Sequence, residues 1–362
     1  MLIALITDAW YPQINGVVTT WNQVREELIA RDHTVDVIHP GLFRTIAAPK
    51  YPEIRLAIYP RRGMRRMLDR LRPDAVHIAT EGSLGLAARG WCRSRRVRFT
   101  TSYHTRFPQY LQTYFEIPPA MTYRFLRWFH GPATRTLVTT PSMRDDLSAH
   151  GFDPDKLIVW TRGVCLDRFT VRQAGAERSA APGSSALNDL PHPRFLFVGR
   201  VAPEKNIEAF LKLDLPGSKV VVGDGPLLPK LREKFPQVIF TGFKTGDDLA
   251  SHVSACDVFV FPSLTDTFGV VMLEAMACGL PVAAFPVIGP IDVVGPQQGV
   301  AGFLDNDLRA ACLKCLDLDR AKVRTYAEQF TWDRCADMVL ANLAINPAPG
   351  TQPGVPASAG MV

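Results

Sequence analysis

Residues 261–282 read FPSLTDTFGVVMLEAMACGLPV, and this stretch decides the fold. An apolar run ends at Phe261, turn-forming residues follow, and a helical composition continues to Cys278 before a second apolar run begins at Pro281. This order predicts a strand, a turn, a helix, a second turn and a second strand. Unpaired backbone N–H groups and the positive end of the helix dipole favour a diphosphate at the start of such a helix. The segment therefore predicts an α/β domain with an anion-binding helix terminus.

Short apolar runs alternate with helical patterns along most of the chain. They form two series, 2–7, 34–39, 75–79, 97–101 and 137–140, and then 194–199, 219–222, 238–241, 258–261 and 281–285. Alternation of this kind predicts parallel strands joined by crossover helices. We therefore expect two Rossmann-like, doubly wound α/β domains that face each other across a cleft, where the carboxyl ends of both sheets would bind ligands.

Changes in composition mark the expected domain boundaries. Residues 171–193 are rich in Ala, Gly, Ser and Pro, which is typical of a linker between an N-terminal domain over 1–170 and a C-terminal domain over 194–325. We expect a helix over 326–346 that crosses back to the first domain. Residues 347–362 are expected to be disordered because Pro, Ala and Gly dominate them.

The overall composition is that of a folded protein without a membrane span. The chain has 362 residues, of which 47% are hydrophobic and 21% charged, and this favours burial in about two domains over disorder. No apolar stretch reaches the ~20 residues of a spanning helix, so we expect any membrane contact to be peripheral. Seven cysteines without an export signal favour a reducing cytoplasm. Cys312 and Cys315 have helical spacing, and we expect them to pack in a core.

The charge is distributed unevenly. Residues 44–106 carry fifteen Lys and Arg against four Asp and Glu, whereas the whole chain has a net charge of +6. We therefore expect an anionic partner for the N-terminal half. Nucleic acid is not favoured, because no nucleic-acid-binding motif accompanies this charge. A nicotinamide or flavin enzyme is not favoured either, because no G-x-G-x-x-G follows the first strand of either series.

Two carboxylates flank the predicted helix start. Asp266 precedes the helix and Glu274 follows eight residues later, which predicts that both lie near one helix face and hold different hydroxyls of one elongated ligand. Gly269 would let that ligand approach the backbone. The alternative interpretation is that Asp266 only caps the helix and that Glu274 is solvated.

Taken together, residues 266–282 resemble the signature of the retaining, family 4-like glycosyltransferases with the GT-B fold, E-x-F-G-x-x-x-x-E followed by A-M-A-x-G-x-P-V. The matching residues are Phe268, Gly269, Glu274, Ala275, Met276, Ala277, Gly279, Pro281 and Val282, with Val270 among the donor-binding residues that the resemblance implies. Asp266 departs from the pattern, since it is one methylene shorter than the family's Glu. This departure puts the choice of hexose in doubt, but not the reaction class.

The resemblance implies further site residues. Arg200 and Lys205 would neutralise the diphosphate leaving group without a metal ion or other cofactor. His104 would contact the donor sugar near the reacting carbon, and Gly16 would lie against the donor phosphates. The residues expected near the nucleotide base are Gly223, Asp224, Thr241 and Gly242. Front-face attack is thought to operate in this family, so no carboxylate nucleophile is expected, and a paired-carboxylate hydrolase is the less favoured enzyme class.

Two basic segments predict an acceptor or membrane surface. Residues 59–72 combine six arginines with apolar residues at helical spacing, and residues 109–135 interleave aromatic residues with arginines. The residues expected to contact the membrane or acceptor are Arg61, Arg62, Arg65, Arg66, Tyr110 and Trp128. A solvated or core-packed helix explains either segment equally well.

Within the family, residues 7–18 and 102–105 look most like the bacterial and plastid glycolipid synthases, including glycosyl and sulfoquinovosyl diacylglycerol synthases. This resemblance implies transfer of glucose or glucuronic acid from a UDP donor to a lipid acceptor, diacylglycerol being favoured, at the anionic cytoplasmic face of a membrane. One alternative is a GDP-mannose-dependent mannosyltransferase that acts on a glycolipid. An alternative of another class is a catalytically silent protein that binds sugar or nucleotide.

Overall fold

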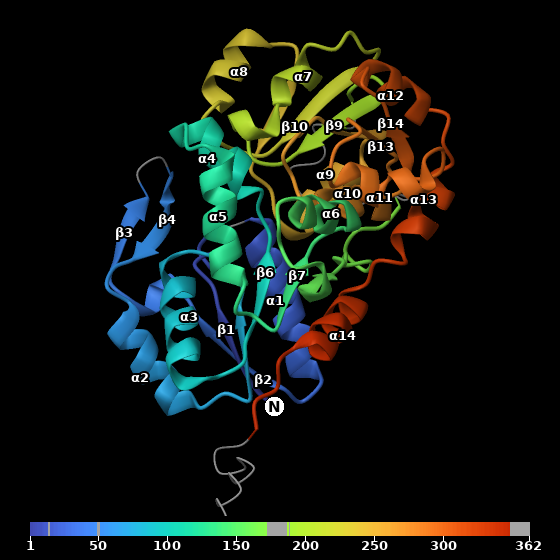
Figure 1. Ribbon diagram of the computed structural model, residues 1–362. Helices are drawn as coiled ribbons and strands as arrows, with labels where there is room; N and C mark the ends of the chain where they lie inside the picture. The colour runs from blue at the N-terminus through green and yellow to red at the C-terminus, as the bar shows by residue number, and fades with distance from the viewer. Residues whose placement is uncertain (14, 49–50, 172–186, 188, 348–362) are drawn as a thin grey trace, which may run out of the picture.

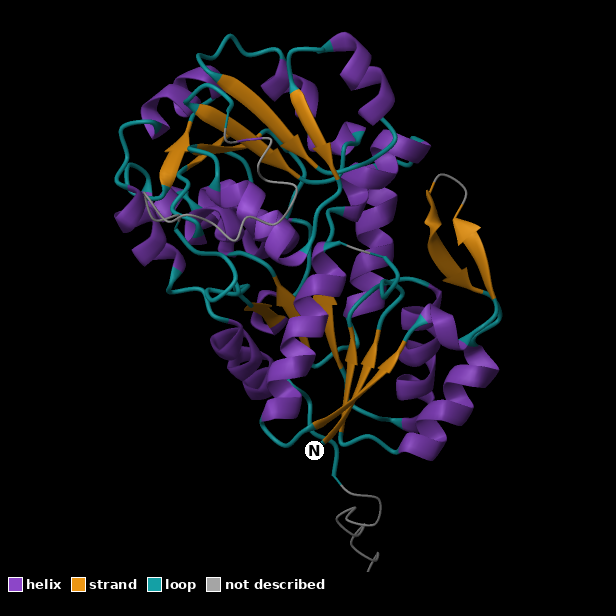
Figure 2. Cartoon of the chain, turned by 180° about the vertical axis from the view of Figure 1, so that it is seen from behind, coloured by secondary structure: helices purple, strands orange, loops and turns teal. Residues whose placement is uncertain are grey.

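The protein consists of two α/β units, each built on a six-stranded parallel sheet (Figure 1). The computed structural model describes residues 1–13, 15–48, 51–171, 187 and 189–347. Helices cover both faces of the sheets, as Figure 2 shows from behind. The expected doubly wound architecture is therefore confirmed.

The first sheet has the strand order β2-β1-β5-β6-β7-β8. Its strands are β1 (Leu2–Ile6), β2 (Thr34–Ile38), β5 (Ala75–Ile78), β6 (Thr100–Tyr103), β7 (Arg135–Val138) and β8 (Leu157–Val159), and an antiparallel hairpin adds β3 (Thr45–Ala48) and β4 (Tyr51–Ala57). The helices of this unit are α1 (Gly16–Ala30), α2 (Arg61–Leu71), α3 (Ser83–Arg95), α4 (Phe107–Phe115), α5 (Pro119–His130) and α6 (Pro141–Ala149). The sequence pattern did not predict β8 or the hairpin.

The second sheet has the order β11-β10-β9-β12-β13-β14. Its strands are β9 (Arg194–Val198), β10 (Ser218–Val222), β11 (Ile239–Gly242), β12 (Val258–Phe261), β13 (Val282–Ala284) and β14 (Gly302–Leu304). Its helices are α7 (Ile207–Leu211), α8 (Leu228–Lys234), α9 (Gly246–Ser254), α10 (Val270–Ala277), α11 (Pro290–Val293), α12 (Leu308–Cys315) and α13 (Arg320–Ala327). A separate buried core lies on each face of this sheet.

The C-terminal helix α14 (Trp332–Asn342) returns to the first unit, as expected, and lies beside α1 (Figure 1). Trp332, Cys335 and Val339 are buried in one apolar cluster with Trp21 of α1. At the rim, Arg31 pairs with Asp337 at 2.9 Å. Because α14 follows the second unit in the chain but packs on the first, it ties the two units together.

Three further expectations concern the cysteines, membrane spans and tails. Cys312 and Cys315 are buried and free on α12, which confirms core packing. Within the described ranges, no helix is both long and apolar enough to cross a bilayer. Most of the expected linker over 171–193 and the tail beyond residue 347 lie outside the described residues.

Candidate active site

The second sheet reverses its strand order between β9 and β12, which lie side by side. In doubly wound sheets, ligands bind at such a reversal, in the crevice outside the carboxyl ends of the strands. The loops that leave these two strands are residues 199–206 and 262–269, and side chains join them. Asn206 Nδ2 donates to the carbonyl of Pro262 at 3.0 Å, and Thr265 Oγ1 donates to that of Glu204 at 3.3 Å. Most of the predicted catalytic residues therefore lie on two loops that form one structural unit.

A charge pair spans this reversal point. Lys205 Nζ lies 2.6 Å and 2.9 Å from the two carboxylate oxygens of Asp266, and about a quarter of each side chain is exposed, 25% and 22%. A partly exposed ion pair contributes little stability, so its main effect is to fix the two groups relative to each other. Asp266 does not cap α10, so the capping interpretation was wrong. Arg200 lies on the first of the two loops and is partly buried.

The start of α10 differs from the expectation in one respect. The helix begins at Val270, and Gly269 precedes it with a φ of +83°, a left-handed conformation that favours glycine. Asp266 is therefore on the loop, and helical spacing from Glu274 does not apply to it. A Cβ at Gly269 would also lie 2.9 Å from Cζ of Phe261, and Phe268 is 5% exposed within the core. Glycine at position 269 and a buried Phe268 are thus required by the local backbone and packing, whether or not a ligand binds here.

Glu274 lies on α10 and is partly buried. Burial raises its pKa to about 7, although the nearby positive charge of Arg168 opposes the shift. The solvated-residue interpretation was therefore wrong. A carboxyl group with this pKa is poised to gain or lose a proton near neutral pH when a ligand changes its surroundings.

The residues predicted to lie near the nucleotide base are at the carboxyl ends of β10 and β11. The N–H of Gly223 donates to the carbonyl of Gly242 at 2.9 Å, and a Cβ at Gly223 would lie 1.9 Å from the carbonyl oxygen of Gly199. Glycine at 223 is therefore demanded by close packing of the strand ends. Asp224 is exposed beside it, and Thr241 is partly buried.

Gly16, the residue of the first unit that is predicted to contact the donor phosphates, begins α1. The Asn15 side chain accepts from the N–H groups of Val17 and Val18, so it caps the helix. Gly16 is exposed, and no atom of the protein lies within 4 Å of the position a Cβ would take. Val17 near the start of α1 and Val270 at the start of α10 pack against the same apolar cluster.

The loop 262–269 contacts the first unit directly. Thr267 Oγ1 donates to the carbonyl of His104 at 2.6 Å, and Thr139 Oγ1 donates to the carbonyl of Thr267 at 2.9 Å. His104 follows β6 and Thr139 follows β7, so the carboxyl ends of the two sheets meet here. The structure therefore brings His104 together with the loop that carries Asp266.

The ring of His104 is partly buried, and both of its nitrogens face N–H groups. Trp21 Nε1 lies 2.9 Å from Nε2, and Arg162 Nη2 lies 3.1 Å from Nδ1. Burial and the positive charge of Arg162 hold the pKa of His104 well below its usual value. The sequence pattern missed Trp21 and Arg162. The apolar run over residues 157–159, followed by Trp160 and Gly163, was the signal that could have indicated a further strand end.

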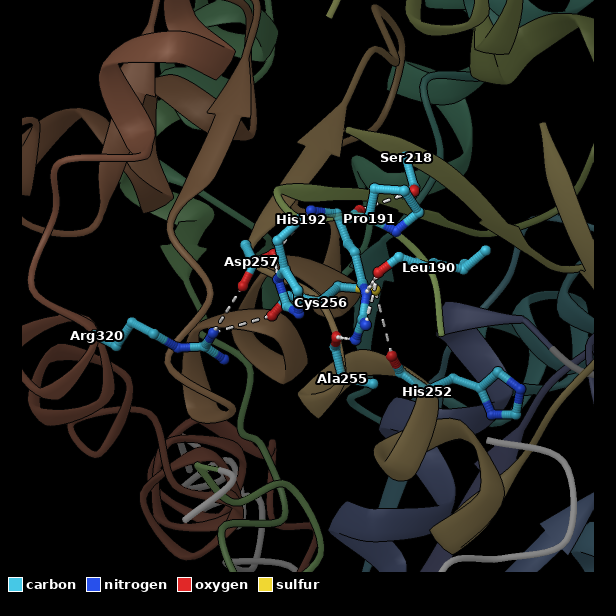
Figure 3. A network of polar contacts seen from close by, with 10 residues as sticks. Leu190, Pro191, His192, Ser218, His252, Ala255, Cys256, Asp257 and Arg320 are labelled. Carbon is cyan, nitrogen blue, oxygen red and sulfur yellow. Dashed lines mark hydrogen bonds and ion pairs between the residues drawn. The ribbon is translucent and has the colours of Figure 1, made fainter. Parts of the chain in front are cut away.

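A second polar network lies at the opposite, amino end of the second sheet (Figure 3). Asp257 accepts from His192 Nδ1 and from the backbone N–H of Arg194, and Arg320 approaches its other oxygen. A hollow of about 420 Å³ is lined by His192, Asp257 and Arg320 among others. Doubly wound sheets bind ligands at the carboxyl ends of their strands. We therefore assign this network a structural role, which is to hold together the starts of β9 and β12.

The predicted membrane residues lie on α2, α4 and α5. Met64 and Leu68 of α2 are fully buried in the core, so the apolar face of this helix cannot enter a membrane. The side chains of Arg61, Arg62, Arg65 and Arg66 are exposed, and so is an apolar stripe on α5 made of Met121, Phe125 and Trp128. Arg89 of α3 stacks on Trp128 at 3.8 Å, which places α3 against α5. The side chain of Tyr110 lies outside the described residues.

Comparison with known proteins identifies the family. The model for Glycosyltransferase Family 4 matches residues 14–168, and the model for Glycosyl transferases group 1 matches residues 192–318. The chain is 30% identical, over 84% of its length and 76% of the relative's, to a GDP-mannose-dependent alpha-mannosyltransferase of Corynebacterium glutamicum. It is 27% identical to an alpha-monoglucosyldiacylglycerol synthase of Streptococcus pneumoniae, over 87% of this chain and 78% of that one.

The fold is also that of a solved structure. The Anabaena protein HepE in complex with UDP-glucose superposes with a TM-score of 0.71 at 15% identity, over 95% of this chain and all of that one. Within the described residues, no group of three or more His, Cys, Asp or Glu side chains could hold a metal ion. From the family models, the relatives and the fold, it follows that this chain is a glycosyltransferase of family 4 with the GT-B fold.

Proposed function

We propose that the protein transfers a hexose from a nucleoside diphosphate sugar to a membrane lipid, with retention of the anomeric configuration. The observation that carries the proposal is the Lys205–Asp266 pair at the reversal of the second sheet, on loops that also carry Arg200. The cations would hold the diphosphate, and Asp266 would accept hydrogen bonds from hydroxyls of the sugar. The start of α1, with open space at Gly16, would complete the phosphate site.

The chemistry needs charge stabilisation more than a nucleophile. The bond between the anomeric carbon and the diphosphate oxygen breaks, and the acceptor oxygen forms its bond on the same face. The proton of the acceptor hydroxyl leaves with the diphosphate. Negative charge grows on the leaving group, and fixed cations such as Arg200 and Lys205 stabilise it without requiring a metal ion.

The acceptor proposal rests on the relatives and on one surface. The Streptococcus relative is named for diacylglycerol, and the exposed arginines of α2 and the apolar stripe of α5 present charge and aromatic groups on two helices that both pack against α3. Such a surface suits peripheral contact with an anionic bilayer. We favour UDP-glucose or UDP-glucuronic acid as donor and diacylglycerol as acceptor, at the cytoplasmic face of the membrane.

GDP-mannose with a glycolipid acceptor is the second candidate. The Corynebacterium relative is named for GDP-mannose and is the more similar of the two relatives in identity. Asp266, which is shorter than the Glu of the family pattern, is the residue at which donor preference would differ.

A donor screen tests the proposal. Purified protein, incubated with EDTA, membrane lipid extract and radiolabelled UDP-glucose, UDP-glucuronic acid or GDP-mannose, is expected to label a lipid with one of these donors. The linkage formed should keep the anomeric configuration of the donor. If no donor labels any lipid and none is hydrolysed, the enzyme proposal is wrong.

Because of Glu274, donor binding is expected to depend on pH. With a pKa of about 7 in the free protein, Glu274 is protonated in about half of the molecules at pH 7. If hydroxyls of the donor donate to its ionised form, binding lowers the pKa and releases up to about half a proton per donor near pH 7. Calorimetry in buffers of different ionisation enthalpy measures this release.

Glu274→Gln is expected to bind the donor more weakly and to release no proton, whereas the exposed control Glu233→Gln should behave as the wild type. Because the pKa of Glu274 in the folded state is raised above its unfolded value, ionisation costs folding free energy as the pH rises from about 4.5 through 7. Glu274→Gln should therefore melt at a higher temperature than the wild type at pH 8. Equal proton release in both proteins would contradict the assigned role.

The arginines of α2 are expected to contribute to membrane binding. Replacing Arg61, Arg62, Arg65 and Arg66 with Gln should weaken sedimentation with anionic liposomes, since each basic group near such a surface contributes about 1 kcal/mol. Donor binding should not change. A matched control removes the same charge elsewhere on the surface, at Lys230, Arg232, Lys322 and Arg334. Equal liposome binding by the two fourfold variants would rule out a specific role for α2.

A further inference from the structure

A buried arginine, Arg162, lies directly behind His104. It follows β8 and is 3% exposed, and its Nη1 donates to the backbone carbonyls of Trp160 and Thr161, each at 2.9 Å. Its Cζ lies 4.1 Å from the centre of the Trp160 ring and 5.8 Å from that of Phe268. In the described parts of the chain, no carboxylate forms an ion pair with it. Burial without a counter-ion is costly, so packing alone is a poor reason for a cation here.

A second buried arginine provides a comparison. Arg194 is also 3% exposed, and it donates to the carbonyls of Leu190 and Ala255, which lie in the network at the amino end of the second sheet (Figure 3). It joins the starts of β9 and β12, far along the strands from the loops that carry Lys205 and Asp266. Arg162 differs because it directs Nη2 at the ring of a predicted site residue.

The two donors around His104 restrict the charge of its ring. A neutral imidazole has one N–H group and one acceptor nitrogen, so it satisfies one of the two facing donors, from Trp21 and Arg162. An imidazolium has no acceptor, and its two N–H groups would point at two other N–H groups. Protonation is therefore opposed by geometry as well as by burial and by the charge of the guanidinium.

We propose that Arg162 is a positioning residue for hexosyl transfer, which with Trp21 keeps the imidazole of His104 neutral and in a fixed orientation, while the backbone carbonyl of His104 accepts from Thr267 of the loop 262–269. The inference rests on the proposed function and explains why a neutral ring is needed there. Glycosyl transfer passes through an oxocarbenium-like transition state, in which positive charge grows on the anomeric carbon. The family resemblance implies that His104 contacts the donor sugar near that carbon, where a protonated ring would oppose the reaction.

The other titratable and charged groups near His104 have partners of their own, so Arg162 is the cation that faces its ring. His77 of β5 is bonded on both nitrogens, to Thr100 and Ser102 hydroxyls, and burial lowers its pKa to about 3, so it is neutral. Asp266 on the facing loop is paired with Lys205. Arg106, two residues after His104, directs Nη1 at the carbonyl of Leu264.

The charge of His104 can be measured in the free protein by NMR of labelled histidine rings. The signal of His104, identified by its loss in His104→Asn, is expected not to titrate between about pH 5.5 and 8.5 in the wild type, across the usual histidine range. In Arg162→Met with Trp21→Phe it should titrate within that range, and the matched control Arg194→Met should leave it unchanged. A wild-type His104 that titrates normally would overturn the proposal.

Turnover tests whether Arg162 acts through His104. Arg162→Met is expected to lower kcat by up to about a hundredfold with little change in the donor KM, because a small misplacement of a site group has effects of this size. The loss should deepen as the pH falls from 8 to 6, as His104 gains a proton. Arg162→Lys should recover part of the activity, whereas Arg194→Met should keep kcat near normal.

A double-mutant cycle completes the test. In the His104→Asn background, Arg162→Met should cost little further activity, whereas multiplying effects would show that Arg162 acts independently and would overturn the proposal. If the wild type transfers no sugar at all, the proposed function is wrong. The NMR titration still decides the claim about Arg162, because it needs no turnover.

Discussion

The ion pair between Lys205 and Asp266 is the contact around which the site is arranged. The pair can form because β9 and β12 are neighbours at the point where the second sheet reverses its strand order. The loops that follow these two strands contact each other at the carboxyl edge of the sheet. The left-handed Gly269 then turns the chain from the loop that carries Asp266 into α10, which carries Glu274. About a quarter of each side chain is exposed, so the pair is partly accessible from solvent.

The first unit contacts the loop 262–269 through uncharged polar groups, namely the hydroxyl of Thr139 and the backbone carbonyl of His104. Thr139 and Thr267 join the loop 262–269 to the strand ends of the first sheet, and α14 packs on the first unit in the apolar cluster that also contains Trp21. A neutral His104 between Trp21 and Arg162 extends this pattern. In the proposed function, cations would face the diphosphate and a neutral group would lie beside the sugar, and this arrangement would match the charges that develop during glycosyl transfer.

Much of this arrangement follows from the sequence, because its signals are local. Apolar runs predicted ten strands, and residues 266–282 predicted the family and the site loop. Two kinds of feature were not predictable, namely short strands and properties that depend on tertiary packing. Short strands such as β8 and β14 lack a period long enough to recognise. The burial that raises the pKa of Glu274 depends on tertiary packing. The same holds for α2, whose amphipathic pattern suits a core as well as a membrane, and for Arg162, which meets His104 only after folding.

The most direct test of this account is a crystal structure of the protein with UDP-glucose or GDP-mannose bound. We expect a diphosphate between the start of α1 and the two loops of the second sheet, within hydrogen-bond distance of Arg200 and Lys205, with Asp266 facing the hydroxyls of the sugar. A nucleotide sugar bound elsewhere, such as in the hollow beside His192 and Arg320, with the Lys205–Asp266 loops empty, would contradict it.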